Sequence, residues 1–320
     1  MRPIIKYRGG KSREIPHLVW NMPRFTGRYV EPFFGGGALF FYLEPHEAII
    51  NDINTPLMLF YKGIRDDFDR VRRELSTLAD VYKANRSKFD ALKKNHPKER
   101  VEDTNEALYY SIRDMFNGKT AKAYTDATIY YFINKTAYSG MIRYNADGEF
   151  NVPFGRYKRL SIDNVSLSHS RLLQRAALYN GDYRKTFDLC RPDDFVFLDP
   201  PYDCVFSDYG NEEYRDGFDE QNHRRLAADF HNLPCKAMMV IGRTKLTEEL
   251  YGADIVDEYS KDYAVNIRNR FKASARHIIV TNYRKAWDEH PLTPRDKASA
   301  MKLETIQPML FENTSYGQPE

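Results

Sequence analysis

Residues 28–54 have the sequence RYVEPFFGGGALFFYLEPHEAIINDIN, and the expected architecture follows from this segment. The stretch Arg28–Leu43 begins with residues typical of a short strand, continues through three glycines that favour a tight turn, and ends in a helical pattern. Ala48–Asn54 is an apolar run that leads into acidic Asp52 and predicts a second strand. Two strands joined by one helix form a βαβ unit with parallel strands, which predicts an α/β fold.

The pattern of a buried sheet returns from about residue 160 onward. LYNGDY at Leu178–Tyr183 is typical of a strand end, and DFVFLDPPY at Asp194–Tyr202 is typical of a buried strand followed by a turn. KAMMVIG at Lys236–Gly242 and RHIIVTNY at Arg276–Tyr283 predict two further strands. The sheet is therefore expected to be assembled from two separate parts of the chain.

The segment between these two parts has a different character. Residues 57–116 carry Leu, Lys, Arg, Glu and Asp at helical spacing, with an exposed loop expected at Lys93–Asn105. Another helix is expected over ATIYYFINKTAYSGM, with its end at Gly140. In Ile142–Arg159 the tripeptide Ala-Asp-Gly indicates a hairpin turn. The expected parts are a discontinuous catalytic domain (1–56 and 160–285), an insertion (57–159) and a tail (286–320).

The composition favours a globular protein of the cytoplasm. Hydrophobic residues make up 42% of the 320 residues, and the net charge of +3 neither demands nor excludes a polyanionic partner. The cysteines, Cys190, Cys204 and Cys235, form no CxxC pair and are expected to be reduced thiols, and no His/Cys cluster indicates a metal. No signal peptide is recognised, and no run approaches the roughly 18 apolar residues of a membrane span.

Acidic and glycine residues gather where the expected strands end. Open α/β sheets bind ligands there, and the glycine turn, Asp52, Asp182 and Asp199 all occupy such ends. Asp52 is suited to accept hydrogen bonds from ribose hydroxyls, or alternatively to cap the next helix. Lys11 is suited to meet the carboxylate of an amino-acid cofactor, or to lie in a solvated loop. The glycine turn is not a GxGxxG motif, and the sequence has no GxxxxGK[ST] phosphate loop, so neither a dinucleotide nor a nucleoside triphosphate is favoured as the ligand.

The tetrapeptide Asp199-Pro200-Pro201-Tyr202 closes a buried strand, where a carboxylate is costly unless donors surround it. An exocyclic amine held between Asp199 and the Pro200 carbonyl supplies such donors and presents its nitrogen to a sulfonium methyl. Tyr202 offers a face on which a base can stack. The alternative interpretation is a Pro-Pro turn in which the aspartate caps a helix.

Five segments share their order with one family of enzymes: KYRGGK, YVEPFFGGGALFF, INDIN, NKTAYSGMIRYNADGEFNVPFGRYK and FVFLDPPY. On these motifs, over roughly residues 3–285, the chain resembles the Dam-type (alpha-class, D12 family) DNA adenine-N6 methyltransferases. The resemblance implies a Rossmann-like, S-adenosylmethionine-dependent methyltransferase sheet domain with an inserted helical-bundle and β-hairpin DNA-recognition domain. It implies that the cofactor contacts Tyr7, Lys11, Phe33, Gly35, Asp52, Asp182 and Asp199.

The resemblance also implies how DNA is recognised. A base inside a duplex cannot reach a buried site, so the target adenine is expected to be flipped out. Arg143 is expected to read a guanine, Tyr138 to wedge into the base stack, and Lys158 to meet a phosphate. Ser139 stands where several members have Asn, so the target sequence is not carried over. The expected DNA-binding residues are Lys6, Tyr138, Ser139, Arg143, Pro153, Arg156 and Lys158.

The expected activity is site-specific methyl transfer to N6 of adenine in double-stranded DNA, without a metal, with S-adenosylhomocysteine as product. Asp199, Pro200 and Tyr202 are the expected catalytic residues. The alternatives are a catalytically silent DNA-binding regulator, which the intact tetrapeptide disfavours, and an RNA or protein methyltransferase, which the GEFNVPFGRYK hairpin disfavours. A cognate restriction endonuclease in the same cell is compatible with this activity, and no stable protein partner is implied.

Overall fold

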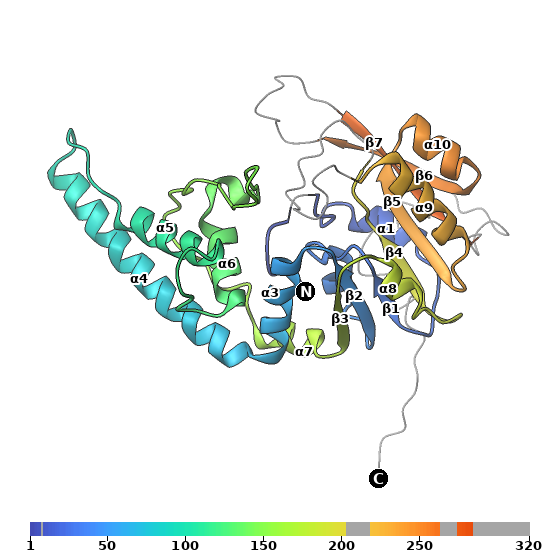
Figure 1. The fold of residues 1–320 in the computed structure, drawn as a ribbon, viewed down its shortest axis with the longest axis horizontal. Helices are drawn as coiled ribbons and strands as arrows, with labels where there is room; N and C mark the ends of the chain where they lie inside the picture. The colour runs from blue at the N-terminus through green and yellow to red at the C-terminus, as the bar shows by residue number, and fades with distance from the viewer. Residues whose placement is uncertain (8, 203–217, 263–273, 284–320) are drawn as a thin grey trace, which may run out of the picture.

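The computed structural model describes residues 1–7, 9–202, 218–262 and 274–283. At its centre lies a seven-stranded sheet with the order β3-β2-β1-β4-β5-β7-β6 (Figure 1). All pairings within the group β1 to β5 are parallel, whereas β7 is antiparallel to both β5 and β6. The prediction of an α/β fold with a parallel βαβ unit is therefore confirmed. The strands span Tyr29–Glu31 (β1), Ala48–Asp52 (β2), Ala176–Asn180 (β3), Phe195–Leu198 (β4), Lys236–Gly242 (β5), Ile255–Asp262 (β6) and Ser274–Thr281 (β7).

The direction in which strands are added reverses at β1. This strand pairs with β2 on one side and with β4 on the other, so the chain continues outward from it in both directions. Open α/β sheets bind their ligands at such a reversal, beyond the carboxyl ends of the strands. Glu31 ends β1 and Asp199 directly follows β4, so two acidic residues occupy this position.

Each face of the sheet is covered by its own set of helices, because successive strand residues point to opposite sides. Ile50 and Phe197 belong to the cluster on one face, and Ile49 and Leu198 to the cluster on the other. The first face is covered by α1 (Ile15–Asn21), α2 (Ala38–Leu43), α3 (Thr55–Asp66) and α7 (Leu167–Leu173), and the second by α8 (Arg184–Phe187), α9 (Glu220–His231) and α10 (Lys245–Tyr251).

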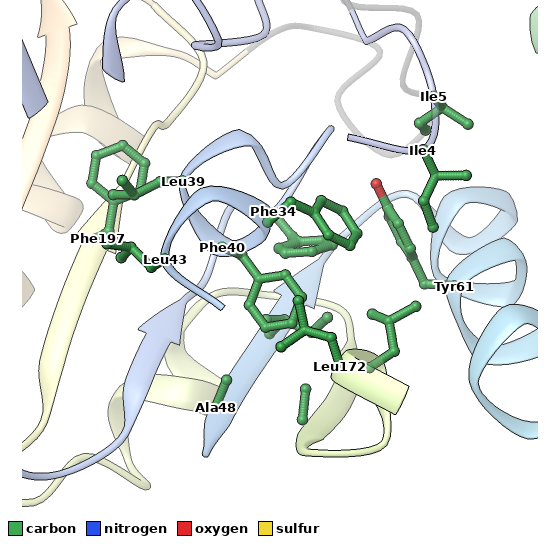
Figure 2. Packing of buried hydrophobic residues seen from close by; sticks show 14 of the residues in the cluster. Ile4, Ile5, Phe34, Leu39, Phe40, Leu43, Ala48, Tyr61, Leu172 and Phe197 are labelled. Carbon is green, nitrogen blue, oxygen red and sulfur yellow. The ribbon is translucent and has the colours of Figure 1, made fainter. Parts of the chain in front are cut away.

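Aromatic rings in the core of the first face pack against the glycine turn after β1. Figure 2 shows Phe34, Phe40 and Tyr61 gathered in the core of the first face. The centroid of the Phe34 ring lies 5.4 Å from that of Phe40 and 4.8 Å from that of Tyr61. Gly37 has a φ of 62°, and a Cβ there would lie 2.5 Å from the Phe34 ring. Glycine is therefore required at this position by both conformation and space.

A third hydrophobic cluster lies away from the sheet, among α4 (Phe68–Asn95), α5 (Thr104–Phe116) and α6 (Asp126–Thr136) (Figure 1). Tyr109 of α5 and Phe132 of α6 are buried in it. The helical character predicted for residues 57–116 is confirmed, and the predicted loop after α4 is shorter than expected because α4 extends into it.

The hairpin expected in residues 142–159 is a tight turn with short flanks rather than a pair of long strands. Tyr144 and Phe150 form an antiparallel bridge, and the Asn145 N–H donates to the Glu149 carbonyl at 2.9 Å. Phe150 belongs to the cluster formed by α4 to α6, so the turn is anchored on the helices.

One prediction of secondary structure is wrong in detail, and one strand is absent from the predictions. Helix α6 ends at Thr136 and not at Gly140, because Ala137 is extended and bridges Phe154. The sequence does not predict β6, since IVDEYSKD is polar and the strand lies at the edge of the sheet, where only one neighbour is needed.

The expected tail and Cys204 lie outside the described residues. Among the helices that the structure describes, none has the length and apolar character needed to cross a membrane.

Candidate active site

A buried cation lies where the strand order reverses. Lys11 precedes α1 and is only 3% exposed. Its Nζ lies 2.7 Å from Oδ1 of Asp199 and donates to the Gly9 carbonyl at 3.0 Å. A buried ammonium group loses its hydration and needs such partners. The structure thus brings together two of the predicted cofactor residues from opposite parts of the chain.

The carboxylate of Asp52 is bound by two backbone donors. Its Oδ2 accepts from the Gly35 N–H at 2.8 Å, and its Oδ1 accepts from the Asn54 N–H at 2.9 Å. The cap of α3 is Asn54, whose side chain accepts from the Leu57 N–H, so the capping alternative for Asp52 is excluded. Asp52 instead joins the end of β2 to the glycine turn, which keeps a negative charge at the carboxyl edge of the sheet.

Tyr7 packs directly on the glycine turn. A Cβ at Gly35, whose φ is 48°, or at Gly36 would lie 2.9 Å from the Tyr7 side chain. Burial, followed by the charge of nearby Asp52, raises the pKa of the Tyr7 hydroxyl well above its usual value. Tyr7 is therefore a neutral ring at physiological pH, held between the glycine turn and the acidic end of β2.

Glu31 is a residue of this site that the sequence reasoning missed. It is 2% exposed and accepts a hydrogen bond from the Tyr29 hydroxyl at 2.9 Å. Burial raises the pKa of Glu31 well above its usual value, and the charges of Asp199 and Asp52 add to this effect. The signal was available, because Glu31 ends a strand just as Asp52 does, within the same EPFFGGG segment.

Asp182 and Phe33 lie toward β3 and the second face of the sheet. Oδ2 of Asp182 accepts from Nη2 of Arg225 at 2.9 Å, and its Oδ1 accepts from the Arg184 N–H at 3.0 Å. The Phe33 ring lies 5.4 Å from the Tyr183 ring. Asp182 is therefore held by an arginine that the sequence reasoning did not include in the site.

The Asp-Pro-Pro-Tyr turn is held from several sides. Pro200 is buried and Tyr202 is half-buried. Nζ of Lys11 lies 5.1 Å from the centroid of the Tyr202 ring, which is a cation–π distance. The ring of His277 meets that of Tyr202 at 90°, with 5.0 Å between centroids. The tyrosine of the motif is thus packed between the N-terminal segment and β7.

The residues predicted to bind DNA are all exposed, and Tyr138 and Ser139 lie in the short turn that follows α6. The Tyr138 N–H donates to the Pro153 carbonyl at 2.9 Å. Nε of Arg143 donates to Oδ1 of Asn151 at 2.8 Å, which orients its guanidinium group. Ser139 adopts a left-handed conformation with a φ of 55° and presents its side chain to solvent.

Asn134 of α6 attaches the N-terminal segment to this surface. Its Nδ2 donates to the Lys6 carbonyl at 2.8 Å, and its Oδ1 accepts from the Lys6 N–H at 3.3 Å. Cδ of Lys6 lies 4.0 Å from the position that a Cβ on Gly140 would occupy. Lys6 therefore lies beside the turn that carries Tyr138 and Ser139. Within the described ranges, no cluster of His, Cys, Asp or Glu side chains is arranged to hold a metal.

Together, these features define an α/β protein of the doubly wound class, with charged side chains gathered at the carboxyl ends of β1, β2 and β4. Residues 7–267 match the family model of the D12 class N6 adenine-specific DNA methyltransferases. The chain belongs to this family and is an adenine-specific DNA methyltransferase, a class that uses S-adenosylmethionine.

Three relatives illustrate the similarity. The chain is 30% identical over 291 residues to the Type II methyltransferase M.CviBI of Paramecium bursaria Chlorella virus NC1A, covering 88% of this chain and 100% of the viral protein. It is 32% identical over 266 residues to the Type II methyltransferase M.MjaIII of Methanocaldococcus jannaschii, with 79% and 87% covered. It is 26% identical over 258 residues to the DNA adenine methylase of Haemophilus influenzae, with 78% and 82% covered.

Proposed function

We propose that S-adenosylmethionine binds across the carboxyl ends of β1, β2 and β4. The groups present suit this cofactor, because a buried cation, Lys11, and three carboxyl groups, Glu31, Asp52 and Asp199, converge on one edge of the sheet. The cofactor has a carboxylate, an ammonium group, a sulfonium and a ribose diol, for which this set supplies both charges and hydrogen-bond acceptors. When bound, it supplies the electrophilic methyl group, with no metal required.

The residues proposed to contact the cofactor occupy two regions. Tyr7 lines the glycine turn at Gly35, and Phe33 and Asp182 extend the site toward β3. The carboxylate of Asp52 is proposed to accept the ribose hydroxyls, because it lies at the end of β2 beside the glycine turn and a carboxylate is an acceptor for several hydrogen bonds.

In the proposed reaction, the Asp199 carboxylate and the Pro200 carbonyl each accept a hydrogen bond from one N–H of the adenine amino group. These contacts would orient the amino nitrogen toward the methyl carbon. The nitrogen–carbon bond would form as the carbon–sulfur bond of the cofactor breaks, S-adenosylhomocysteine would leave, and the methylated nitrogen would then lose one proton to solvent. Tyr202 stacks on the flipped base. Most of the rate enhancement comes from positioning and from the fixed charges around the amine.

Residues 57–159 are proposed to form the DNA-recognition domain, with residues 1–56 and 160–285 forming the catalytic domain. The separate hydrophobic cluster of α4 to α6 supports this division, and α3 packs in the cluster that covers the sheet, so it connects the two. Arg143 is proposed to read a guanine of double-stranded DNA, with Tyr138, Ser139 and Pro153 beside it. Lys6, Arg156 and Lys158 complete the proposed contacts.

We also propose that the methyltransferase works beside a cognate restriction endonuclease. Two relatives, M.CviBI and M.MjaIII, are named Type II methyltransferases, which supports this proposal. DNA is isolated from cells that express the wild-type chain or Asp199→Ala and is digested with restriction endonucleases. A site that resists cleavage only in the wild-type sample identifies the protected sequence.

The main observation behind the proposed mechanism is the 2.7 Å contact between Nζ of Lys11 and Oδ1 of Asp199, because it holds this carboxylate at the proposed cofactor site. We predict that Asp199→Ala loses nearly all transfer of tritiated methyl groups to duplex DNA per folded molecule; circular dichroism measures the folded fraction, because the substitution also removes the carboxylate partner of buried Lys11. Asp193→Ala is the matched control, since Asp193 is an exposed aspartate just before β4, at the opposite end of the strand. An Asp199→Ala rate above about a tenth of wild type, or a barrier change under about 1.4 kcal/mol, refutes the assignment.

A further inference from the structure

A buried acid–imidazole pair lies behind the proposed active site. Nδ1 of His277 lies 3.2 Å from Oε2 of Glu14, and the exposed fractions of the two residues are 0% and 4%. The Tyr259 hydroxyl donates to the same carboxylate oxygen. Burial of such polar groups is costly, so their partners hold them in one arrangement. The proposed chemistry at Asp199 makes no use of this pair.

The backbone places both members of the pair next to the catalytic turn. Glu14 lies one turn after Lys11, and its N–H donates to the Lys11 carbonyl at 2.8 Å. In the sheet register, His277 of β7 is opposite Gly242 of β5. A Cβ at Gly242 would lie 3.5 Å from the Tyr202 ring, so this point of the sheet faces the tyrosine.

The contact between His277 and Tyr202 has a defined geometry. The two rings meet edge to face at 90° with centroids 5.0 Å apart. A perpendicular contact of this kind depends on the orientation of both rings. The hydrogen bond from one ring nitrogen of a histidine sets the orientation of the whole ring, and here that bond is made with Glu14. Glu14 is therefore one of the groups that orient the His277 ring, together with the Tyr259 ring, whose centroid lies 5.4 Å from that of His277.

We propose that Glu14 and His277 are positioning residues that hold the Tyr202 ring in the orientation required for stacking on the flipped adenine. The proposal rests on the stacking role assigned to Tyr202 above. The half-buried Tyr202 ring must keep one orientation while a base enters and leaves, and an ordered neighbour reduces the freedom of such a side chain. The pair acts on the base and not on the cofactor, so its loss should lower the methyl-transfer rate more than cofactor affinity.

A double-mutant cycle with Tyr202→Ala tests this inference through single-turnover methylation of duplex DNA at saturating cofactor. We expect His277→Leu and Glu14→Ala each to lower the rate about tenfold in the otherwise unchanged enzyme. Glu14→Gln, which keeps the acceptor oxygen, should stay within about threefold of wild type. In the Tyr202→Ala background, His277→Leu should cost less than about twofold, because its effect requires the tyrosine ring.

Two results overturn the inference. First, if His277→Leu lowers the methylation rate equally with and without Tyr202, the histidine does not act through that ring. Second, if a rise in the S-adenosylmethionine Kd accounts for the whole loss of rate, the histidine acts on the cofactor. A Tyr202→Ala variant with wild-type rate is a different failure, since it refutes the stacking role itself. His277→Phe keeps the ring volume and serves in the same cycle if the leucine variant does not fold.

The matched control is His169→Leu. His169 is also a buried histidine, with its ring nitrogens 2.7 Å from Ser166 Oγ and 2.9 Å from the Arg2 carbonyl. Its ring packs against Phe41, which belongs to the core of the first face. We expect this variant to lose stability and keep the single-turnover rate of the folded enzyme, which separates a general packing loss from the loss of tyrosine positioning.

Discussion

Replacement of Asp52 by asparagine tests the glycine turn and the cofactor site in one experiment. The carboxylate accepts from the Gly35 N–H at 2.8 Å and from the Asn54 N–H at 2.9 Å, and Asp52 is 7% exposed. An asparagine side chain has one acceptor oxygen and one amino group. Whichever way the amide is turned, one backbone donor therefore faces another donor.

The expected magnitude follows from these two contacts. Leaving a buried donor unsatisfied costs about 1–3 kcal/mol, so we expect Asp52→Asn to lower the free energy of unfolding by about 2 kcal/mol. The same substitution removes the charge proposed to accept the ribose hydroxyls. We expect the Kd for S-adenosylmethionine to rise at least tenfold, which corresponds to about 1.4 kcal/mol.

Urea unfolding followed by circular dichroism measures the first quantity, and calorimetric titration with the cofactor measures the second. Asp66→Asn is the control, because Asp66 at the end of α3 is 45% exposed and pairs with the adjacent Arg65. The control should change the free energy of unfolding by less than about 0.5 kcal/mol. Unchanged stability and unchanged affinity of Asp52→Asn would refute both the bracing role and the ribose contact.

Two further predictions concern recognition and pH. Arg143→Ala should relax discrimination at one guanine of the target by about 1–3 kcal/mol, whereas Lys158→Ala should lower the rate on all sequences alike. Methylation rates on the true site and on sites with one substituted base pair distinguish the two effects. A uniform loss with Arg143→Ala contradicts base reading. Burial raises the pKa of Glu31, so the stability that its neutral form contributes is complete below the ordinary pKa of 4.5 and is lost as pH rises through the folded-state pKa. Glu31→Gln should therefore flatten the decline of unfolding free energy above that value, and parallel profiles in wild type and variant contradict a neutral Glu31.

The parts predicted well are those in which a local pattern determines the structure. The βαβ unit of residues 28–54 combines strand, glycine turn and second strand without interruption, and the acidic end at Asp52 follows from the direction of β2. The end of α6 could not be predicted in this way. Ala137 has no local signal that stops a helix, and the extended conformation there accompanies its bridge to Phe154, which is distant in sequence.

The N-terminal segment shows most clearly why the candidate site exceeds what its sequence indicates. KYRGGK has the composition of a solvated loop, and the burial of Lys11 depends on groups that only folding brings close. Lys6 is bracketed by Asn134 of α6, Lys11 pairs with Asp199 after β4, and Glu14 meets His277 of β7. These partners come from three different parts of the chain, so residues 6–14 contact the end of α6, the proposed catalytic turn and the antiparallel strand β7, contacts that the local sequence does not indicate.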